Sequence, residues 1–178
     1  MGRIISSVLV SLDGVVEAPW TWAPFDDEAK AVALGALRTY DGFVMGRESY
    51  ERFSTMWGPV VGDPYIDAVN AAPKHVVSST LDDVSWNASL VTGDPVEQVA
   101  ELRASKTLVK YGTGRLDDLL LAHRLLDEVN LWVWPVVVGS GRHVFEGLST
   151  PVPPLELTSV RELANGSVIH SYVPRYAG

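Results

Sequence analysis

The chain has 178 residues, of which 47% are hydrophobic and 20% charged, and its formal net charge is −8. This length suffices for one domain with a substantial core and is short for two, so we expect a single domain over residues 1–178. Phosphate backbones are held mainly by lysine and arginine, so the negative charge argues against nucleic-acid and anionic-membrane surfaces. The composition favours a protein with a small-molecule substrate.

The absence of cysteine excludes disulfides, thiolate nucleophiles and cysteine-ligated metals. The four histidines lie far apart without metal-ligand spacing, so we expect no metal site. A Gly-x-Ser-x-Gly elbow is missing, which disfavours a serine hydrolase. The start has too short an apolar run for a signal peptide, and no run of about 18 apolar residues occurs. We therefore expect a cytoplasmic protein with no membrane association.

The first predicted strand covers residues 3–12 and ends in an Asp-Gly turn at Asp13. The segment that follows, residues 15–24, has no clear period and contains Trp20 and Trp22. Two tryptophans in a loop can line an apolar pocket for a flat ligand, or they can cover the edge of the hydrophobic core. Both interpretations stay open.

A helix is predicted from Asp26 to about Thr39, and acidic residues open it. The helix dipole favours acids in a first turn, so Asp26 can cap the helix and Asp27 can complement the dipole. The alternative is a catalytic or substrate-binding role for one of these two carboxylates.

A buried strand at 42–46 leads through Gly46 into a short helix predicted at 47–53. Arg47 at the start of that helix can pair bidentately with a phosphate, or it can be an ordinary surface arginine. After helical turns at 65–71, a third strand at 73–80 ends in three hydroxyl side chains that begin at Ser78. Such hydroxyls can bind a ribose phosphate or close a turn.

The chain is organised around a strand, a turn with two glycines and a helix, at residues 106–124. Gly112 and Gly114 permit positive φ and a close ligand approach, and unpaired amides at the start of the helix attract anions. A dinucleotide phosphate can therefore lie here, although a plain strand-to-helix connection has the same pattern. The third glycine of the dinucleotide fingerprint is absent, because Asp117 stands there.

The remaining segments complete an α/β pattern. A brief strand is predicted at 90–92, a helix at 95–102, an apolar strand at 129–138 that Pro135 ends or bends, and a hairpin at 155–173 turning at Asn-Gly. Alternating strands and helices with a closing hairpin predict a mainly parallel central sheet with an antiparallel C-terminal edge.

Five motifs in one order support a family resemblance. They are Ser11-Leu12-Asp13-Gly14, Met45-Gly46-Arg47, Pro73-Lys74-His75-Val76-Val77-Ser78, Tyr111-Gly112-Thr113-Gly114, and Leu126-Asp127-Glu128-Val129 leading into Pro135-Val136-Val137-Val138-Gly139-Ser140-Gly141. From about residue 3 to 173 the chain resembles bacterial proteins built like the C-terminal reductase domain of the bifunctional riboflavin enzyme (RibD C-terminal-domain-like). These proteins share the three-layer dihydrofolate reductase-like fold.

The resemblance implies NADPH-dependent reduction of a small pterin- or pyrimidine-like substrate, similar to the 5-amino-6-(5-phosphoribosylamino)uracil reductase of riboflavin biosynthesis. It implies that Asp13, as catalytic residue, faces the nicotinamide and the substrate together with the loop of Trp20 and Trp22, and it makes Asp26 and Asp27 candidates for holding a pterin. It also implies a homodimer. The cofactor-binding residues that it implies are Gly46, Arg47, Ser49, Ser78, Gly112, Thr113, Gly114, Arg115 and Leu116.

Two positions differ from the riboflavin reductase pattern. Lys110 stands where those enzymes typically carry a substrate-binding glutamate, and Ser79 stands where relatives often carry an arginine that could pair with the 2′-phosphate. Two other functions stay open beside the reductase. One is a nucleotide- or flavin-binding module without turnover, and the other is a structural dimerisation domain that pairs through an apolar edge with Trp132 and Trp134.

Overall fold

The computed structural model describes residues 2–177, and in this part of the chain eight strands form one sheet of order β4-β3-β2-β5-β1-β6-β8-β7. The first six strands in that order run parallel, β8 is antiparallel to β6, and β7 is antiparallel to β8. The strands are β1 (Arg3–Ser11), β2 (Gly42–Gly46), β3 (Lys74–Val77), β4 (Ala88–Leu90), β5 (Thr107–Tyr111), β6 (Glu128–Trp134), β7 (Leu155–Glu162) and β8 (Val168–Pro174).

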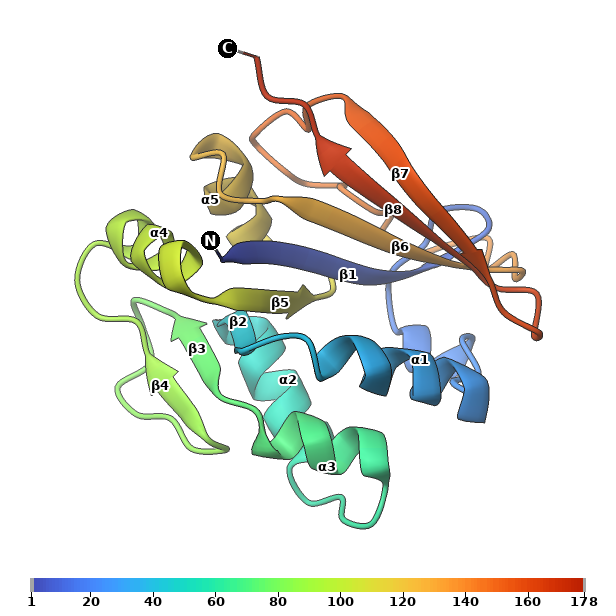
Figure 1. The fold of residues 1–178 in the computed structure, drawn as a ribbon, viewed down its shortest axis with the longest axis horizontal. Helices are drawn as coiled ribbons and strands as arrows, with labels where there is room; N and C mark the ends of the chain where they lie inside the picture. Colours follow the sequence, from blue (N-terminus) through green and yellow to red (C-terminus); the bar gives the residue numbers. More distant parts are fainter. Residues whose placement is uncertain (1, 178) are drawn as a thin grey trace.

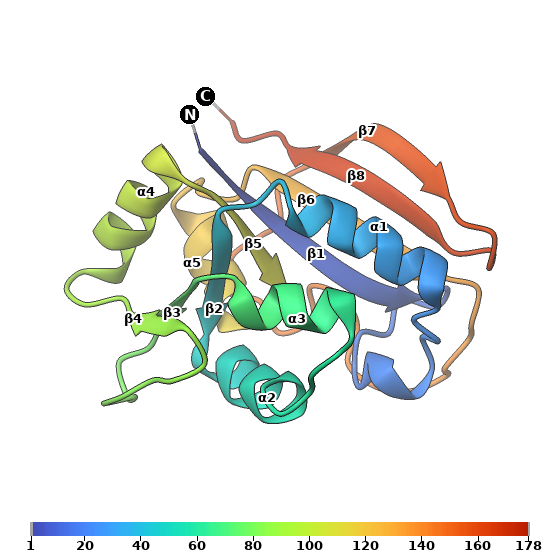
Figure 2. The same ribbon diagram turned by 60° about the horizontal axis from the view of Figure 1, so that its bottom comes forward.

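Helices cover both faces of this sheet, which makes three layers (Figure 1). One face packs against α1, α2 and α3, and the other against α4 and α5. Figure 2 shows α1 running along one face beside β1, while the hairpin β7–β8 extends the sheet past β6. The helices are α1 (Asp27–Leu37), α2 (Arg47–Trp57), α3 (Pro64–Ala71), α4 (Pro95–Ser105) and α5 (Arg115–Ala122), with a short 3-10 helix η1 (Pro19–Thr21).

Capping side chains explain where three helices begin. The Asp26 carboxylate accepts a hydrogen bond from the Ala29 amide at 2.9 Å, and Asp63 and Asp94 each accept two amide bonds at the starts of α3 and α4. Proline follows both Asp63 and Asp94, where its missing N–H costs nothing. These starts can be recognised from the sequence alone.

A buried lysine fixes the far end of α3. Lys74 is fully buried, and its Nζ donates to the carbonyls of Val69, Asn70 and Ala72 at 2.6, 2.9 and 2.7 Å. The Nζ also lies 4.2 Å from the centre of the Trp86 ring. Burial lowers the pKa of Lys74 to about 8. The ammonium therefore caps the C-terminus of α3 and ties this helix to β3.

The predicted α/β architecture with its antiparallel hairpin is confirmed, with differences at the ends of elements. Helix α2 continues to Trp57, where a helix over 47–53 was predicted, because the Trp57 ring stacks on Phe53 with centroids 4.3 Å apart. Strand β6 ends at Trp134 and not at residue 138, since Pro135 has no N–H to donate to a neighbouring strand.

Trp132 and Trp134 are 5% and 1% exposed. They belong to the core between the sheet and α1, so the apolar dimerisation edge that the sequence left open at these two residues is not present. No helix within residues 2–177 is long and apolar enough to cross a bilayer.

Candidate active site in two joined cavities

The strand-end cavity, as we call it, has a volume of about 930 Å³ and lies at the carboxyl ends of β2, β3 and β5. Adjacent parallel strands open a crevice at this edge of an α/β sheet, and ligands commonly bind there. The cavity brings together residues far apart in the sequence. Predicted cofactor residues that line it are Gly46, Arg47, Ser49, Ser78, Thr113, Gly114, Arg115 and Leu116.

The glycine turn between β5 and α5 uses some of its amides internally. The Gly112 amide donates to the Ser7 carbonyl at 3.1 Å, and the Gly114 amide donates to Asp117 Oδ2 at 2.7 Å. Within residues 2–177, the amides of Arg115 and Leu116 have no protein acceptor. The donors left for an anion at this helix start are therefore those of Arg115 and Leu116, and not those of the two glycines.

Both glycines leave space above the turn. A Cβ atom added at Gly112 or Gly114 would meet no other atom within 4 Å. Only Gly112, with φ of +72°, needs the left-handed conformation, because Gly114 is extended with φ of 177°. The turn can thus be approached closely by a ligand, and a side chain at position 114 would enter that space without backbone strain.

A buried ion pair supports this turn from below. Lys110 Nζ lies 2.8 Å from Asp117 Oδ1, and the two side chains are 5% and 2% exposed. The ammonium also donates to the Gly112 carbonyl and, at 3.4 Å, to the Ser6 hydroxyl. Because Asp117 also accepts from the Gly114 amide, the pair connects the end of β5, the turn and the first turn of α5.

Arg47 lies in the first turn of α2, at the other side of the strand-end cavity. Its Nη1 donates to the Thr80 hydroxyl at 2.8 Å and its Nε to Glu51 at 2.8 Å. The Ser78 hydroxyl accepts the amides of Thr80 and Leu81 and so closes the turn after β3. The guanidinium thus lies next to the hydroxyl-rich loop, and half of its side chain is exposed.

The second cavity, which we call the aromatic cavity, has a volume of about 840 Å³ and lies between α1, α2, α3 and the sheet. Arg52 lies 5.5 Å from the Trp20 ring centre at its rim. Both Trp20 and Gly112 line this cavity. Its other aromatic lining residues are Phe25, Tyr40, Phe53, Trp57, Tyr65, Tyr111 and Trp132.

Two tyrosine hydroxyls meet inside the aromatic cavity. Tyr65 Oη donates to Tyr111 Oη at 3.1 Å. Burial raises the pKa of Tyr65 to about 12 and that of Tyr111 well above 10, so both hydroxyls keep their protons at neutral pH. Since Tyr111 Oη accepts the hydrogen bond from Tyr65, its own O–H can donate to a ligand.

The two cavities share three lining residues, Ser49, Tyr111 and Thr113, and we call this shared boundary the junction. Arg142, from the loop after β6, reaches this junction and donates to the Thr113 hydroxyl at 2.7 Å. The two cavities are therefore adjacent at this point.

Asp13 lies outside the lining of both cavities. Its carboxylate accepts bonds from the Ser11 hydroxyl and from the amides of Val138 and Gly139, at 2.6, 3.1 and 2.8 Å. These bonds, that of Ser11 first, lower the pKa of Asp13 to about 2. The carboxylate joins the turn after β1 to the loop after β6. Its catalytic role stays a prediction.

Three other predicted substrate residues lie outside the cavity linings. Asp26 caps α1 and accepts a second hydrogen bond, from the side-chain Nδ2 of Asn165, at 2.8 Å. The bond from the Ala29 backbone amide lowers the pKa of Asp26 most, and the bond from Asn165 lowers it next. Asp27 lies in the exposed first turn of α1. Trp22 packs at the edge of the core and donates its Nε1 to the Glu17 carbonyl. For these residues the cap, dipole and core-edge interpretations match the observed geometry, and a substrate role stays untested.

Sequence reasoning missed three features of the site. The ion pair of Lys110 with Asp117 spans a strand, a turn and a helix, and the hydroxyls of Tyr65 and Tyr111 come from segments 46 residues apart. Arg142 reaches the glycine turn through the conformation of the loop after β6. Of these, only the polar Lys110 in an apolar strand gave a signal in the sequence.

We expect Lys110→Met to lower the free energy of unfolding by about 3–5 kcal/mol, because it leaves the buried Asp117 carboxylate without its partner. Urea denaturation measures this change. The double variant Lys110→Met/Asp117→Leu should recover most of the loss, since apolar groups then replace both charges. Arg175→Met, which breaks an exposed ion pair with Glu156, is the control and should cost less than about 1 kcal/mol. An equally small loss for Lys110→Met would contradict the prediction.

For Asp13→Asn we expect lower stability at pH 7 and a difference from the wild type that disappears in acid. Folding lowers the pKa of Asp13 from 3.8 to about 2, so its contribution is complete above pH 4 and is lost as the pH falls toward 2. Chemical denaturation at several pH values from 7 down to about 2 measures the trend. Glu162→Gln on the exposed strand β7 is the control. A stability difference independent of pH would argue against this role of the carboxylate.

Comparison with known proteins places this architecture in a family. The model of the RibD C-terminal domain matches residues 3–169. A curated relative, the uncharacterized protein YyaP of Bacillus subtilis (strain 168), is 26% identical over 179 residues, which cover 93% of this chain and 92% of the relative.

Solved structures have the same fold. A putative riboflavin biosynthesis protein from Shewanella sp. PV-4 superposes with a TM-score of 0.73 at 22% identity, covering 98% of this chain and 99% of that one. A diaminohydroxyphosphoribosylaminopyrimidine deaminase/5-amino-6-(5-phosphoribosylamino)uracil reductase from Thermotoga maritima gives 0.68 at 14% identity, covering 98% of this chain and 57% of that one. The neighbours share the dihydrofolate reductase-like fold expected from the sequence, and this chain belongs to the RibD C-terminal domain family.

Proposed function

We propose that the protein is an NADPH-dependent reductase of a small pterin- or pyrimidine-like substrate. The observation that carries the proposal is the junction of the two cavities at Ser49, Tyr111 and Thr113. A dinucleotide in the strand-end cavity would bring its ring to this junction, and a planar substrate in the aromatic cavity would meet it there. Membership of a family with reductase structures supports the proposal.

The strand-end cavity fits a dinucleotide in its donor groups. The amides of Arg115 and Leu116 would bind the pyrophosphate over the space left by Gly112 and Gly114. Ser78 and Arg47 line the same cavity and would bind the adenosine ribose and its 2′-phosphate. The charges of Lys110 and Asp117 cancel each other, so this ion pair would not repel an anion bound above the turn.

The aromatic cavity fits a flat ring. Its walls offer aromatic faces, and the Tyr111 hydroxyl offers a hydrogen bond at the junction. The cofactor would supply the hydride, and the protein's residues would hold the two rings together and exclude water. That Asp13 acts on the substrate, and that two copies pair, are also proposals carried over from the family.

NADPH should raise the melting temperature of the wild type by about 5 °C or more at 100 times its Kd. Gly114→Val should fold but lose this shift, because the new side chain fills the space that the pyrophosphate needs. Thermal denaturation with and without NADPH measures both effects. Ala104→Val, on the exposed surface of α4, is the control and should keep the full shift.

If NADPH raises the melting temperature of neither the wild type nor the control, the reductase proposal is wrong. If NADPH shifts both but is never oxidised with any pterin or pyrimidine, the protein is a nucleotide-binding module without turnover.

Arg47→Met should weaken NADPH binding by about tenfold or more and leave NADH binding nearly unchanged. The guanidinium would form charge-assisted hydrogen bonds only to the 2′-phosphate, which NADH lacks. Titration of each cofactor against the variant and against Arg38→Met, which removes an arginine outside both cavities, measures the difference. If Arg47→Met weakened the binding of NADPH and NADH equally, Arg47 would contact a part of the dinucleotide other than the 2′-phosphate.

A further inference from the structure

A row of polar side chains crosses the floor of the aromatic cavity. Strand register aligns Tyr111 with Ser7, Ser7 with Asn130, Asn130 with Ser171, and Ser171 with Ser159. All five line the cavity. Paired strands direct opposed side chains to the same face, so these groups form one continuous line across five strands. The neighbouring row is apolar at Leu9, Trp132 and Ile169 and ends on β7 at Arg161, which also lines the cavity.

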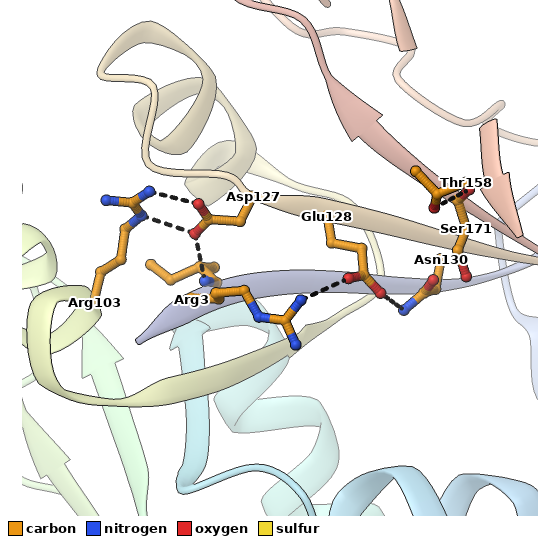
Figure 3. Close-up of polar contacts among 8 residues, drawn as sticks. Arg3, Arg103, Asp127, Glu128, Asn130, Thr158 and Ser171 are labelled. Atoms are coloured by element: carbon orange, nitrogen blue, oxygen red, sulfur yellow. Dashed lines mark hydrogen bonds and ion pairs between the residues drawn. The ribbon is translucent and has the colours of Figure 1, made fainter. Parts of the chain in front are cut away.

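Asn130, in the middle of this row, is 9% exposed and is held in one orientation (Figure 3). Its Nδ2 donates to Glu128 Oε1 at 3.0 Å, and Glu128 Oε2 accepts from Arg3 Nη1 at 3.2 Å. A carboxylate only accepts hydrogen bonds, so the NH₂ group of Asn130 must face Glu128. The carboxamide oxygen is thereby directed away from Glu128.

The Oδ1 atom of Asn130 is buried and has no hydrogen-bond partner among residues 2–177. An unpaired acceptor in an apolar surrounding costs free energy, so such atoms are rare and call for an explanation. On its own face of β6, Asn130 lies between Glu128 and Trp132. The oxygen has almost no exposed surface, so a ligand donor would satisfy it once the neighbouring side chains that cover it shift.

We propose that Asn130 Oδ1 accepts a hydrogen bond from a ring N–H of the substrate, and that the aromatic cavity thereby selects planar heterocycles with an unsubstituted N–H on one edge. Glu128 and Arg3 are positioning residues that keep the oxygen available. The ligand is called a substrate on the basis of the proposed function, but its binding requires no cofactor. The two claims can therefore be tested separately.

The test compares lumazine (pteridine-2,4-dione) with 1,3-dimethyllumazine, in which methyl groups replace the ring N–H donors. Isothermal titration of the full chain should show about tenfold tighter binding of lumazine to the wild type. In Asn130→Leu, lumazine binding should fall to the level of the dimethyl compound, whose affinity should change less than twofold. Thr158→Val, on the neighbouring strand β7 and outside the cavity lining, is the control and should keep the full preference.

Glu128→Gln tests the positioning role. Glutamine can donate as well as accept, so Asn130 can turn its amide over, and the preference for lumazine should drop to threefold or less while the affinity for 1,3-dimethyllumazine stays the same. If Glu128 had only a structural role, Glu128→Gln would weaken the binding of both compounds equally. This variant also provides a result if Asn130→Leu does not fold.

Equal affinity of the wild type for both compounds, or the failure of both to bind, would overturn the proposal, because Asn130 Oδ1 would then not select a ring with N–H donors. A clear lumazine preference without any NADPH binding would instead keep the recognition by Asn130 and remove the reductase. NADPH binding without a preference for lumazine would keep the reductase proposal and remove the recognition by Asn130.

Discussion

The candidate site depends on two opposite charges buried under the glycine turn. Lys110 ends β5 and Asp117 lies in the first turn of α5, so the contact between them fixes how the chain passes from strand to helix. Asp117 also binds the Gly114 amide, which leaves the amides of Arg115 and Leu116 pointing outward. A lone carboxylate here would repel a phosphate. The paired lysine removes that repulsion and keeps the turn rigid.

Parallel strands then bring the other parts of the site to this turn. Strands β2, β3 and β5 end at one edge of the sheet, so Arg47 and Ser78 face the glycine turn although they are distant in the sequence. The arrangement follows from strand order, which the motifs in the sequence imply only through a family resemblance. Local signals predicted the individual elements, but only the sheet shows which strand ends are neighbours.

The sequence predicts best where a short stretch determines its own structure. Asp26 caps its helix, and Asn165-Gly166 turns the hairpin, because both signals act within a few residues. The length of α2 depends instead on stacking of Trp57, and the pairs of Lys110 with Asp117 and of Tyr65 with Tyr111 depend on packing between elements. The polar row around Asn130 requires the register of five strands, which no local pattern contains.

The two cavities differ in the hydrogen-bonding groups that they present. The strand-end cavity presents backbone amides and the half-exposed guanidinium of Arg47, which suit an anion that keeps some contact with water. The floor of the aromatic cavity presents neutral hydroxyls and one amide oxygen, and burial keeps the hydroxyls of Tyr65 and Tyr111 protonated. A charged group placed directly on the polar row would lose hydration, and its counter-charge would have to come from the ionised side chains elsewhere in the lining. The charged side chains of this cavity, Glu28, Lys30, Arg52, Arg142 and Arg161, line it beside the polar row, so its charges and its neutral hydrogen-bonding groups come from different parts of the lining.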